Sequence, residues 1–358
     1  MQKKVIVGMS GGVDSSVAAY LLQKQGYEVI GVTMGMWQNE GEREGCGNMA
    51  AVQDARRVAE KLGIAYHVLD FRKEFRENVV EYFMDSYEKG QTPNPCIMCN
   101  RHVKWEALLQ YADEIGADSI ATGHYARIEK HPKTGRLAIK HSVTETKDQT
   151  YALYRLTQEQ LKRTIMPIGS YEKQEIRRIA ENIDDFVAKK RDSQDICFIP
   201  DGDYTAFLQR QRGMTQNTGD FVDMDGNVLG QHKGLAYYTV GQRKGLGIAF
   251  GKPMYVHHLD GEKNQVVLCD NAALFTQRVY AAQLNPMAVS AFVEGMRFLG
   301  KIRYSHKTAW CTVKSVAGDV MECVFDEPQR AVTPGQALVL YDGDYVAGGG
   351  TILGTCIK

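Results

Sequence analysis

The residues best suited to chemistry are two cysteines in the segment PNPCIMCN, Cys96 and Cys99. Such a pair can be half of a metal site, a redox pair or the source of a nucleophile. A structural zinc site needs four ligands, but the chain has no second CxxC motif and His102 is the only close helper. A thioredoxin-like pair opens a helix directly after a strand, whereas two prolines precede this pair. The third interpretation joins the pair to Cys197 in DSQDICFIP, at the end of a strand that can reach the same sheet edge.

A glycine-rich loop, GMSGGVDSS at residues 8–16, joins an apolar run to a helical pattern. Gly11 and Gly12 allow a tight turn, and the helix that follows offers free N–H groups and a dipole that favour phosphate. The loop lacks the lysine of a Walker A motif and does not match GxGxxG. It therefore suits a compact diphosphate, with the carboxylate of Asp14 available for Mg²⁺. A plain strand-to-helix turn is the alternative, which the place of the loop in an α/β pattern disfavours.

The elements that must position these residues alternate between short β-branched runs and helical patterns. This alternation predicts a doubly wound parallel sheet with helices on both faces, which binds ligands at the carboxyl ends of its strands. Glycines at 26 and 63 mark the ends of the first two helices. The predicted strands cover residues 3–10, 27–34, 65–71 and 117–126, and the predicted helices cover 15–26, 51–63 and 103–116.

The pattern changes near residue 200, where short strands with turn residues replace the strand–helix alternation. Asp225-Gly226 between apolar stretches is a hairpin signal. From about residue 275 the sequence is typical of a small all-β barrel. We therefore expect three domains: an α/β domain at 1–202, a small mixed central domain at 203–273 and a β-barrel at 274–358.

The composition is that of an ordinary globular protein, with 44% hydrophobic and 24% charged residues. No apolar run is long enough to span a bilayer, and the N-terminal apolar run leads into the glycine loop without a cleavage site. We therefore expect a cytoplasmic protein that does not bind membranes. In that compartment eight cysteines suggest free thiols, catalysis or metal before structural disulfides.

The charges balance, with 43 basic and 43 acidic residues, so long-range attraction to nucleic acid is absent but local basic patches are allowed. The segment KIRYSHK at 301–307 gathers four cationic or imidazole side chains around Tyr304, which suits phosphate contact and base stacking. An ordinary exposed strand explains it equally well. The basic run at 189–191 can favour a thiolate at Cys197, although such runs are more often solvated faces.

The loop SGGVDS resembles that of the ATP pyrophosphatase group of adenylating enzymes, which have an adenine nucleotide α-hydrolase-like fold. Nearly the whole chain is similar to the tRNA-specific 2-thiouridylase family, the tRNA uridine 2-sulfurtransferases. The blocks that carry the resemblance include GMSGGVDSSVAAYLL, EKGQTPNPCIMCNRHVKW, GADSIATGHYARI, KDQTYALYRLTQEQL, DSQDICFIPDGDYTAFL, YYTVGQRKGLGIA, KIRYSH and EPQRAVTPGQALVLYDGD.

The resemblance implies roles for particular residues. Cys99 falls on the position of the nucleophile and Cys197 on that of the persulfide carrier. The implied target-base residues are Asn94, Pro95 and Cys96. The implied ATP-binding residues are Gly8, Met9, Ser10, Gly11, Gly12, Val13, Asp14, Ser15, Met34 and Gly123. The implied tRNA-contact residues are His124, Lys147, Asp148, Gln149, Arg303, Tyr304 and Gln336.

The implied reaction replaces the C2 oxygen of the wobble uridine of lysine, glutamate and glutamine tRNAs with sulfur. ATP and Mg²⁺ adenylate the oxygen, a persulfide on Cys197 supplies sulfur, and Cys99 and Cys197 finish as a disulfide that a reductant reopens. A cysteine desulfurase or a sulfur-relay protein is the implied donor, and the uridine must flip out of its stack. The alternative is a 4Fe–4S cluster on Cys96, Cys99 and Cys197. Some family members carry an acidic residue where this chain has Cys96.

Two other function classes remain to be separated: another adenylating enzyme, such as an amidating synthetase, and an RNA-binding or sulfur-carrier protein with a decayed nucleotide site. The first has no need for two distant thiols, and the intact glycine loop disfavours the second. The remaining cysteines have simpler interpretations. Cys269, Cys311, Cys323 and Cys356 are expected in the core, and Cys46 in a surface loop.

Overall fold

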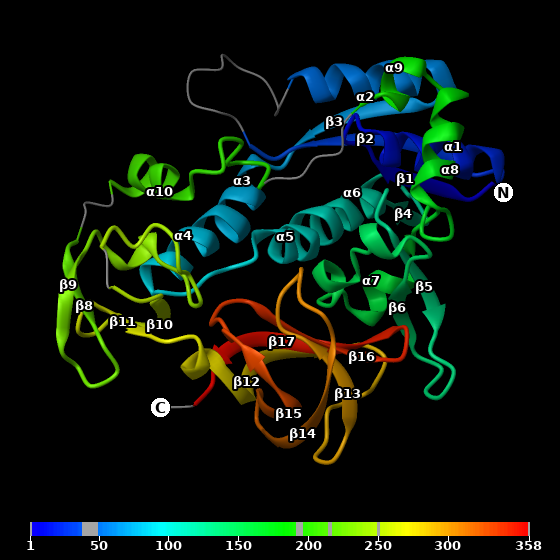
Figure 1. Cartoon of the computed structure of the whole chain (residues 1–358). Coiled ribbons are helices and arrows are strands. Elements are labelled where there is room, and N and C mark those ends of the chain that lie inside the picture. The colour runs from blue at the N-terminus through cyan, green and yellow to red at the C-terminus, as the bar shows by residue number, and fades with distance from the viewer. Residues whose placement is uncertain (1, 38–48, 191–195, 214–216, 249–250, 357–358) are drawn as a thin grey trace.

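The computed structural model describes residues 2–37, 49–190, 196–213, 217–248 and 251–356. Figure 1 shows an α/β part at the N-terminal end, a small sheet beside it and a C-terminal barrel below. Cys46 and Arg191 lie outside the described residues. No helix in the described ranges has the length and apolar character to cross a membrane.

The N-terminal domain is built on a five-stranded sheet in the order β3-β2-β1-β4-β7, and every neighbouring pair is parallel. The chain moves outward from β1 to β3 and then returns to the other side of β1 with β4. This reversal is a topological switch point, the place where open α/β sheets bind ligands. The strands are β1(Lys4–Gly8), β2(Glu28–Gly35), β3(Ala65–Asp70), β4(Ser119–Ala121) and β7(Thr164–Ile165).

Both faces of this sheet are buried, because alternate residues of β1 enter different cores. Val5 and Val7 pack with helices α1, α2, α8 and α9, whereas Ile6 packs with Trp105, Leu108 and the outside of the barrel. The expected doubly wound fold is therefore confirmed. The helices are α1(Val13–Lys24), α2(Met49–Leu62), α3(Arg72–Phe75), α4(Glu81–Glu88), α5(Pro95–Met98), α6(Leu108–Glu114), α7(Gln158–Lys162), α8(Lys173–Glu181), α9(Asp185–Ala188) and α10(Tyr204–Arg212), with π-helices η1(Arg76–Val80) and η2(Cys99–Ala107) and 3₁₀ turns η3(Glu145–Lys147), η4(Thr150–Leu153), η5(Leu235–Tyr237) and η6(Ala272–Leu274).

The predicted ends of the first two helices are confirmed, since Gly26 and Gly63 follow α1 and α2 in left-handed conformations. The helix expected at 103–116 begins earlier, at Cys99, as the π-helix η2. The strand expected at 117–126 ends at Ala121, and the chain then leaves the sheet. The two corrections have a common cause, because a short periodicity does not reveal a π-turn or a change of sheet.

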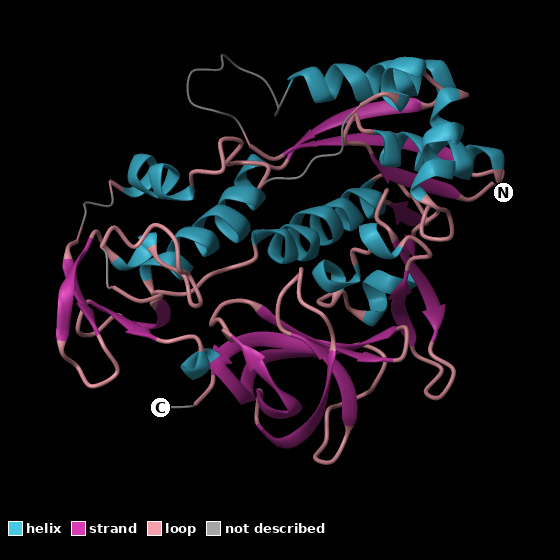
Figure 2. Cartoon of the chain, in the orientation of Figure 1, coloured by secondary structure: helices cyan, strands magenta, loops and turns pink. Residues whose placement is uncertain are grey.

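The central domain is a four-stranded sheet in the order β10-β11-β8-β9. Strands β8 and β9 form the hairpin predicted from Asp225-Gly226, and Gly226 has a φ of +87° in its turn. Figure 2 shows this sheet next to α10, apart from the larger barrel. The strands are β8(Gly219–Val222), β9(Val228–His232), β10(Tyr255–Asp260) and β11(Gln265–Cys269).

The C-terminal strands close into a six-stranded barrel, because β12 pairs with both β15 and β17. The barrel predicted from sequence is thereby confirmed. A hairpin from the N-terminal half, β5 with β6, extends the barrel sheet through the pairing of Tyr345 with Lys140. Cys269, Cys311 and Cys323 are buried as expected, whereas Cys356 is exposed because it follows the last strand. The strands are β5(Ala126–Lys130), β6(Leu137–His141), β12(Phe275–Pro286), β13(Arg297–Lys301), β14(Ala309–Ala317), β15(Val320–Arg330), β16(Ala337–Asp342) and β17(Tyr345–Gly354).

Gly123, just after β4, allows the closest approach between the sheet and helix α1. A Cβ at this position would lie 2.7 Å from both the carbonyl carbon of Asp14 and the amide nitrogen of Ser15. We predict that Gly123→Ala lowers the free energy of unfolding by about 1–3 kcal/mol, because backbone must move to admit the methyl group. Urea unfolding measures the change.

The matched control for that prediction is Gly261→Ala. Gly261 has no atom within 4 Å of a Cβ and does not have a left-handed backbone. Equal stability of the two variants would contradict the close approach.

Candidate active site

The glycine loop makes a tight turn between β1 and α1. Gly11 has a φ of +70°, and a Cβ there would lie 2.4 Å from the carbonyl oxygen of Ala51, so only glycine fits. Gly12 is the N-cap of α1 and supplies no side-chain cap to the first turn. The amide of Ser10 donates to the Ser15 hydroxyl oxygen at 3.1 Å, which fixes the loop across its mouth. The first amides of α1 therefore face a ligand position instead of a capping side chain.

The structure brings Met34 and Gly123 to this loop. A Cβ on Gly8 would lie 3.3 Å from the terminal methyl of Met34, at the carboxyl ends of β1 and β2. Gly123 lies against the backbone of Asp14 and Ser15, at the carboxyl end of β4. The ten residues expected at ATP thus gather at one sheet edge, around the switch point between β1 and β4.

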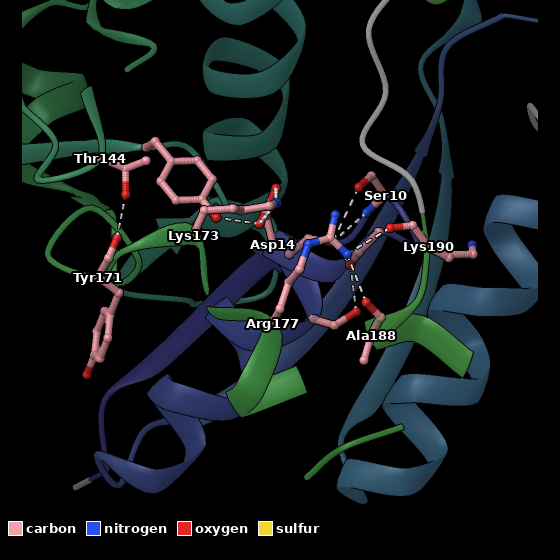
Figure 3. Close-up of polar contacts among 12 residues, drawn as sticks. Ser10, Asp14, Thr144, Tyr171, Lys173, Arg177, Ala188 and Lys190 are labelled. Atoms are coloured by element: carbon pink, nitrogen blue, oxygen red, sulfur yellow. Dashed lines mark hydrogen bonds and ion pairs between the residues drawn. The ribbon is translucent and has the colours of Figure 1, made fainter. Parts of the chain in front are cut away.

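Asp14, the expected carboxylate for Mg²⁺, is bound by two side chains in this structure. The Lys173 ammonium donates to its two carboxylate oxygens at 2.7 and 2.9 Å, and the Tyr125 hydroxyl donates to Oδ1 at 2.7 Å. Figure 3 shows Lys173 and Asp14 directed toward each other. A carboxylate that holds a cation with both oxygens has the donor chemistry for Mg²⁺, so Asp14 fits this role if Lys173 gives way.

The CxxC segment begins with a proline-started helix turn. Asn94 caps α5 by accepting from the amide of Cys96 at 3.1 Å, and Pro95 occupies the first turn. Cys96 is exposed. Cys99 starts η2, is 6% exposed, and packs in a cluster with Phe198.

Cys197 lies beside that cluster, although it is separated from Cys99 by almost a hundred residues. Its neighbours Ile196 and Phe198 pack with Cys99, whereas the Cys197 side chain reaches solvent. Cys197 lies in a turn and not at the end of a strand, which corrects the sequence expectation. The expected gathering of the three cysteines is nevertheless found, because Cys96 and Cys197 are both close enough to raise the pKa of Cys99.

The thiols are free in the described parts of the chain, and no group of three His, Cys, Asp or Glu side chains there is placed to hold a metal ion. The Cys99 sulfur instead contacts the Met36 sulfur at 3.8 Å. As they lie, the three cysteines therefore do not form the ligand set that a 4Fe–4S cluster needs.

Burial controls the charge of these thiols. It raises the pKa of Cys99 to about 12 and also raises the pKa of Cys197. The Lys104 ammonium opposes this effect at both cysteines. In the ligand-free protein, Cys99 is therefore a neutral thiol near pH 7, and Lys104 is the cation that favours its thiolate.

Lys104 also reaches toward the nucleotide side of the site. Burial, together with Lys104, lowers the pKa of His124 well below its usual value, so the imidazole is neutral. His124 packs on Trp105 and exchanges a hydrogen bond with Thr122 at 2.9 Å. The Lys104 ammonium therefore acts electrostatically on both cysteines and on His124, which directly follows Gly123.

Four of the expected tRNA-contact residues form one surface across two domains. The Tyr304 hydroxyl donates to the backbone carbonyl of Asp148 at 3.0 Å, which joins the barrel to the 147–149 loop. The Tyr304 ring is 47% exposed and lies under the Lys301 ammonium. Arg303 is half-buried and donates to the Arg330 carbonyl. A cation beside an exposed ring is the combination that RNA-binding surfaces use.

The other three expected tRNA residues are engaged inside the protein. His124 is buried, the Gln149 side chain accepts from the amide of Tyr125 at 2.8 Å, and Gln336 donates to the Thr92 carbonyl at 2.8 Å. The Gln336 contact holds the barrel against the segment that leads into Asn94. Gln336 therefore helps to position the segment that contains Asn94, Pro95 and Cys96.

Sequence reasoning missed Lys104 and Lys173, and it did not connect Lys190 with the glycine loop. Lys104 lies five residues after Cys99, a spacing that a π-helix uses and an α-helical pattern does not reveal. Lys173 and Lys190 contact the glycine loop from far along the chain, at Asp14 and at the Gly11 carbonyl. Lys190 belongs to the basic run expected to be solvated, and this expectation is wrong because its ammonium also pairs with Asp54. No local signal could have placed Lys173.

Comparison with known proteins gives matches along most of the chain. Three family models match successive parts of the chain: a tRNA methyl transferase HUP domain at 3–201, a tRNA methyl transferase PRC-barrel domain at 205–270 and an aminomethyltransferase β-barrel domain at 276–352. A solved 4-thiouridine synthetase–RNA complex with bound ATP is 22% identical, covers 58% of this chain and 50% of its own, and has a TM-score of 0.38.

The fold and the site thus define a HUP-domain protein with a nucleotide edge and adjacent thiols. The chain is 56% identical to the tRNA-specific 2-thiouridylase MnmA of Lachnoclostridium phytofermentans, over 98% of this chain and 99% of that protein. It is 53% identical to the protein of that name from Clostridioides difficile, over 98% of both. The chain belongs to the tRNA-specific 2-thiouridylase family.

We predict that Lys104→Met shifts the pH profile of thiol alkylation at Cys197 to higher pH and slows alkylation at pH 8. The reason is that Lys104 lowers the pKa of this thiol, so its removal reduces the thiolate fraction. Iodoacetamide labelling, followed by mass spectrometry across pH, measures the profile. Lys130→Met, which removes an exposed lysine from β5, is the control. Coincident profiles for the two variants would rule out the electrostatic role.

Proposed function

We propose that this chain catalyses the ATP-dependent 2-thiolation of the wobble uridine of lysine, glutamate and glutamine tRNAs. The observation that carries this proposal is the 56% identity over 98% of the chain to a tRNA-specific 2-thiouridylase. Membership of that family makes the chain a tRNA uridine 2-sulfurtransferase that uses ATP and acts on tRNA. The amidating-synthetase and decayed-site alternatives are thereby excluded. What we propose beyond this is the work of individual residues.

The first step is adenylation at the glycine loop. The uracil C2 oxygen attacks the α-phosphorus of ATP, diphosphate leaves, and the oxygen becomes part of a good leaving group. We assign the ATP phosphates to residues 8–15 and the rest of the nucleotide to Met34 and Gly123, because these residues share the carboxyl edge of β1, β2 and β4. When bound, Mg²⁺ would neutralise phosphate charge, with Asp14 as its protein ligand.

The second step is sulfur transfer from a persulfide on Cys197. Its terminal sulfur attacks C2, the bond from C2 to the adenylated oxygen breaks, and AMP leaves. The Cys99 thiolate then attacks the Cys197 sulfur, which frees the 2-thiouridine and leaves a Cys99–Cys197 disulfide. A dithiol reductant supplies the two electrons that reopen it. A second route, in which Cys99 attacks the persulfide first and releases sulfide locally, needs the same two thiols.

Because Cys99 is neutral, sulfur transfer depends on the formation of its thiolate. A thiol with a pKa near 12 does not attack the persulfide on its own at neutral pH. Lys104 lowers the pKa of both reacting cysteines, so we assign to it the stabilisation of each thiolate during transfer. The target uridine flips out of its stack toward Asn94, Pro95 and Cys96, beside these thiols.

The tRNA is held on the surface that joins the 147–149 loop to the barrel. We propose that Lys147 and Arg303 contact phosphate and that the exposed Tyr304 ring stacks on a base or sugar. Asp148 holds Tyr304 through its backbone carbonyl, and Gln149 anchors the loop to Tyr125. His124 and Gln336 support this surface from inside the protein.

We further propose domain boundaries at 1–202, 203–273 and 274–358, a cysteine desulfurase or a sulfur-relay protein as sulfur donor, and a cytoplasmic location. The 4Fe–4S cluster on Cys96, Cys99 and Cys197 is the alternative to the persulfide. We favour the persulfide because the three sulfurs do not form a metal-binding group in the described part of the chain.

The test is 2-thiouridine formation on an unmodified tRNA, with ATP and a cysteine desulfurase plus cysteine as donor. The protein is purified without oxygen and assayed before and after chelation, with its iron content measured. We predict activity that is independent of iron and falls below detection in Cys99→Ser and Cys197→Ser. Cys356→Ser is the matched control, because it removes an exposed thiol outside the site.

Activity that rises and falls with iron would overturn the persulfide role of Cys197 and favour the cluster. Full activity in either active-site serine variant would overturn the two-thiol route. Absence of thiolation in every preparation, with tRNA-independent release of AMP, would contradict the function itself.

A further inference from the structure

A pocket of about 130 Å³ lies between helices α4 and α10 and the segment of the chain around η5. Asn217 and Asn264, which precede strands β8 and β11, complete its lining. Figure 1 shows α4, α10 and the sheet of β8–β11 together at one end of the molecule. None of the lining residues is among those assigned to ATP, to the target base or to tRNA. The proposed reaction therefore leaves this pocket without a role.

The lining of the pocket suits an apolar or aromatic side chain. Leu208 and the aromatic residues Tyr87 and Tyr237 contribute most of its apolar wall. Among the described residues that line it, Glu88 carries the one charge, and Arg212 pairs with this carboxylate at 2.8 Å. Phosphate groups of RNA need cations, which this lining does not offer. The volume is close to the roughly 150 Å³ that admits one benzene ring.

The wall of the pocket is continuous with the cluster that surrounds the cysteines. Leu208 packs in the same cluster as Cys99 and Phe198. The Phe198 ring, directly after Cys197, lies against the Phe207 ring with their centroids 5.3 Å apart. Phe207 directly precedes Leu208 on α10. A side chain seated in the pocket is therefore fixed against the same packed unit that holds the two reacting cysteines.

The pocket is also close enough to Cys197 for one partner to cover both. Thr205, in its lining, follows Cys197 by eight residues, a stretch of at most about 29 Å when fully extended. Two turns shorten this stretch, because the Ile199 amide donates to the Ile196 carbonyl at 2.8 Å and the Gly202 amide donates to the Ile199 carbonyl at 3.0 Å. A standard protein interface buries roughly 800 Å² on each partner, a patch about 30 Å across. Cys197 is exposed, so a protein anchored at the pocket reaches its thiol.

We propose that this pocket is the docking site of the protein that delivers sulfur to Cys197, and that it receives an apolar or aromatic side chain of that protein. This inference rests on the proposed function, in which a protein persulfide loads Cys197. The Cys197 thiolate attacks the terminal sulfur of the donor's persulfide, the sulfur–sulfur bond in the donor breaks, and the donor cysteine leaves as a thiolate. No electrons are lost or gained overall, so the step needs no further reactant.

The test measures persulfide formation on Cys197 of the full chain with two kinds of donor. The protein donor is the host cysteine desulfurase with cysteine, supplied with and without the host's sulfur-relay proteins, and the small donor is sodium polysulfide. Alkylation followed by mass spectrometry reads the persulfide. Asn217→Trp places a ring in the pocket from an exposed position. The Asn217 carbonyl, which accepts from the Asn264 amide at 3.4 Å, is kept in this variant.

We expect Asn217→Trp to raise the KM for the protein donor at least about 10-fold, the effect of losing one anchoring side chain from an interface. Loading by polysulfide should stay within about twofold, because a small donor needs no docking site. Asn217→Ala is the matched control, since it leaves the pocket open, and both of its rates should stay within about twofold.

An unchanged KM in Asn217→Trp would overturn the proposal. Equal losses with both donors would assign the position a purely structural role and also overturn it. Weaker tRNA binding in Asn217→Trp, with normal loading by the protein donor, would assign the pocket to RNA. Wild-type protein that polysulfide loads and no protein donor loads would contradict the docking site alone. Wild-type protein that is loaded but forms no 2-thiouridine would contradict the proposed function, and the loading kinetics would still decide the docking site.

Discussion

The contact on which the site depends is the one between Gly123 and the start of helix α1. Without a side chain, the chain leaving β4 comes within van der Waals distance of the Asp14 and Ser15 backbone. This contact fixes the first turn of α1 at the switch point of the sheet, where its amides face the ligand. It also places His124, and through it the Lys104 side of η2, next to the nucleotide edge. The glycine loop and the part of the site near the cysteines are therefore adjacent because the backbone at Gly123 contacts the backbone at the start of α1.

In the part of the site that holds the cysteines, burial makes Cys99 less reactive and also protects it. Burial beside Phe198 keeps Cys99 protonated and shields it from water, and the Lys104 ammonium acts in the opposite direction on its pKa. In the function we propose, the surface that joins Tyr304 to the 147–149 loop holds the tRNA and brings the uridine to these thiols.

The parallel sheet, the barrel and the glycine loop could be predicted from sequence, because period-two runs, turn residues and a GG turn are local signals. The sequence pattern could only suggest that Cys197 joins the CxxC pair, and it gave the wrong reason, because Cys197 lies in a turn and its neighbours Ile196 and Phe198 pack in the cluster of Cys99. Lys173 could not be predicted at all, because 159 residues separate it from Asp14 and no periodicity links α8 to α1. The π-helix η2, which places Lys104, could not be predicted either, because its sequence pattern does not differ from that of an α-helix.

In the proposed reaction, ATP activates the same oxygen atom that sulfur later replaces. The direct measurement uses a tRNA whose target uridine carries ¹⁸O at C2 and reads the mass of the AMP released during one turnover. We expect the AMP to gain the ¹⁸O atom, because the C2–oxygen bond breaks after the oxygen has joined the α-phosphorus. AMP with no ¹⁸O, alongside full formation of 2-thiouridine, would contradict adenylation of the uridine and with it the proposed link between the glycine loop and the thiols.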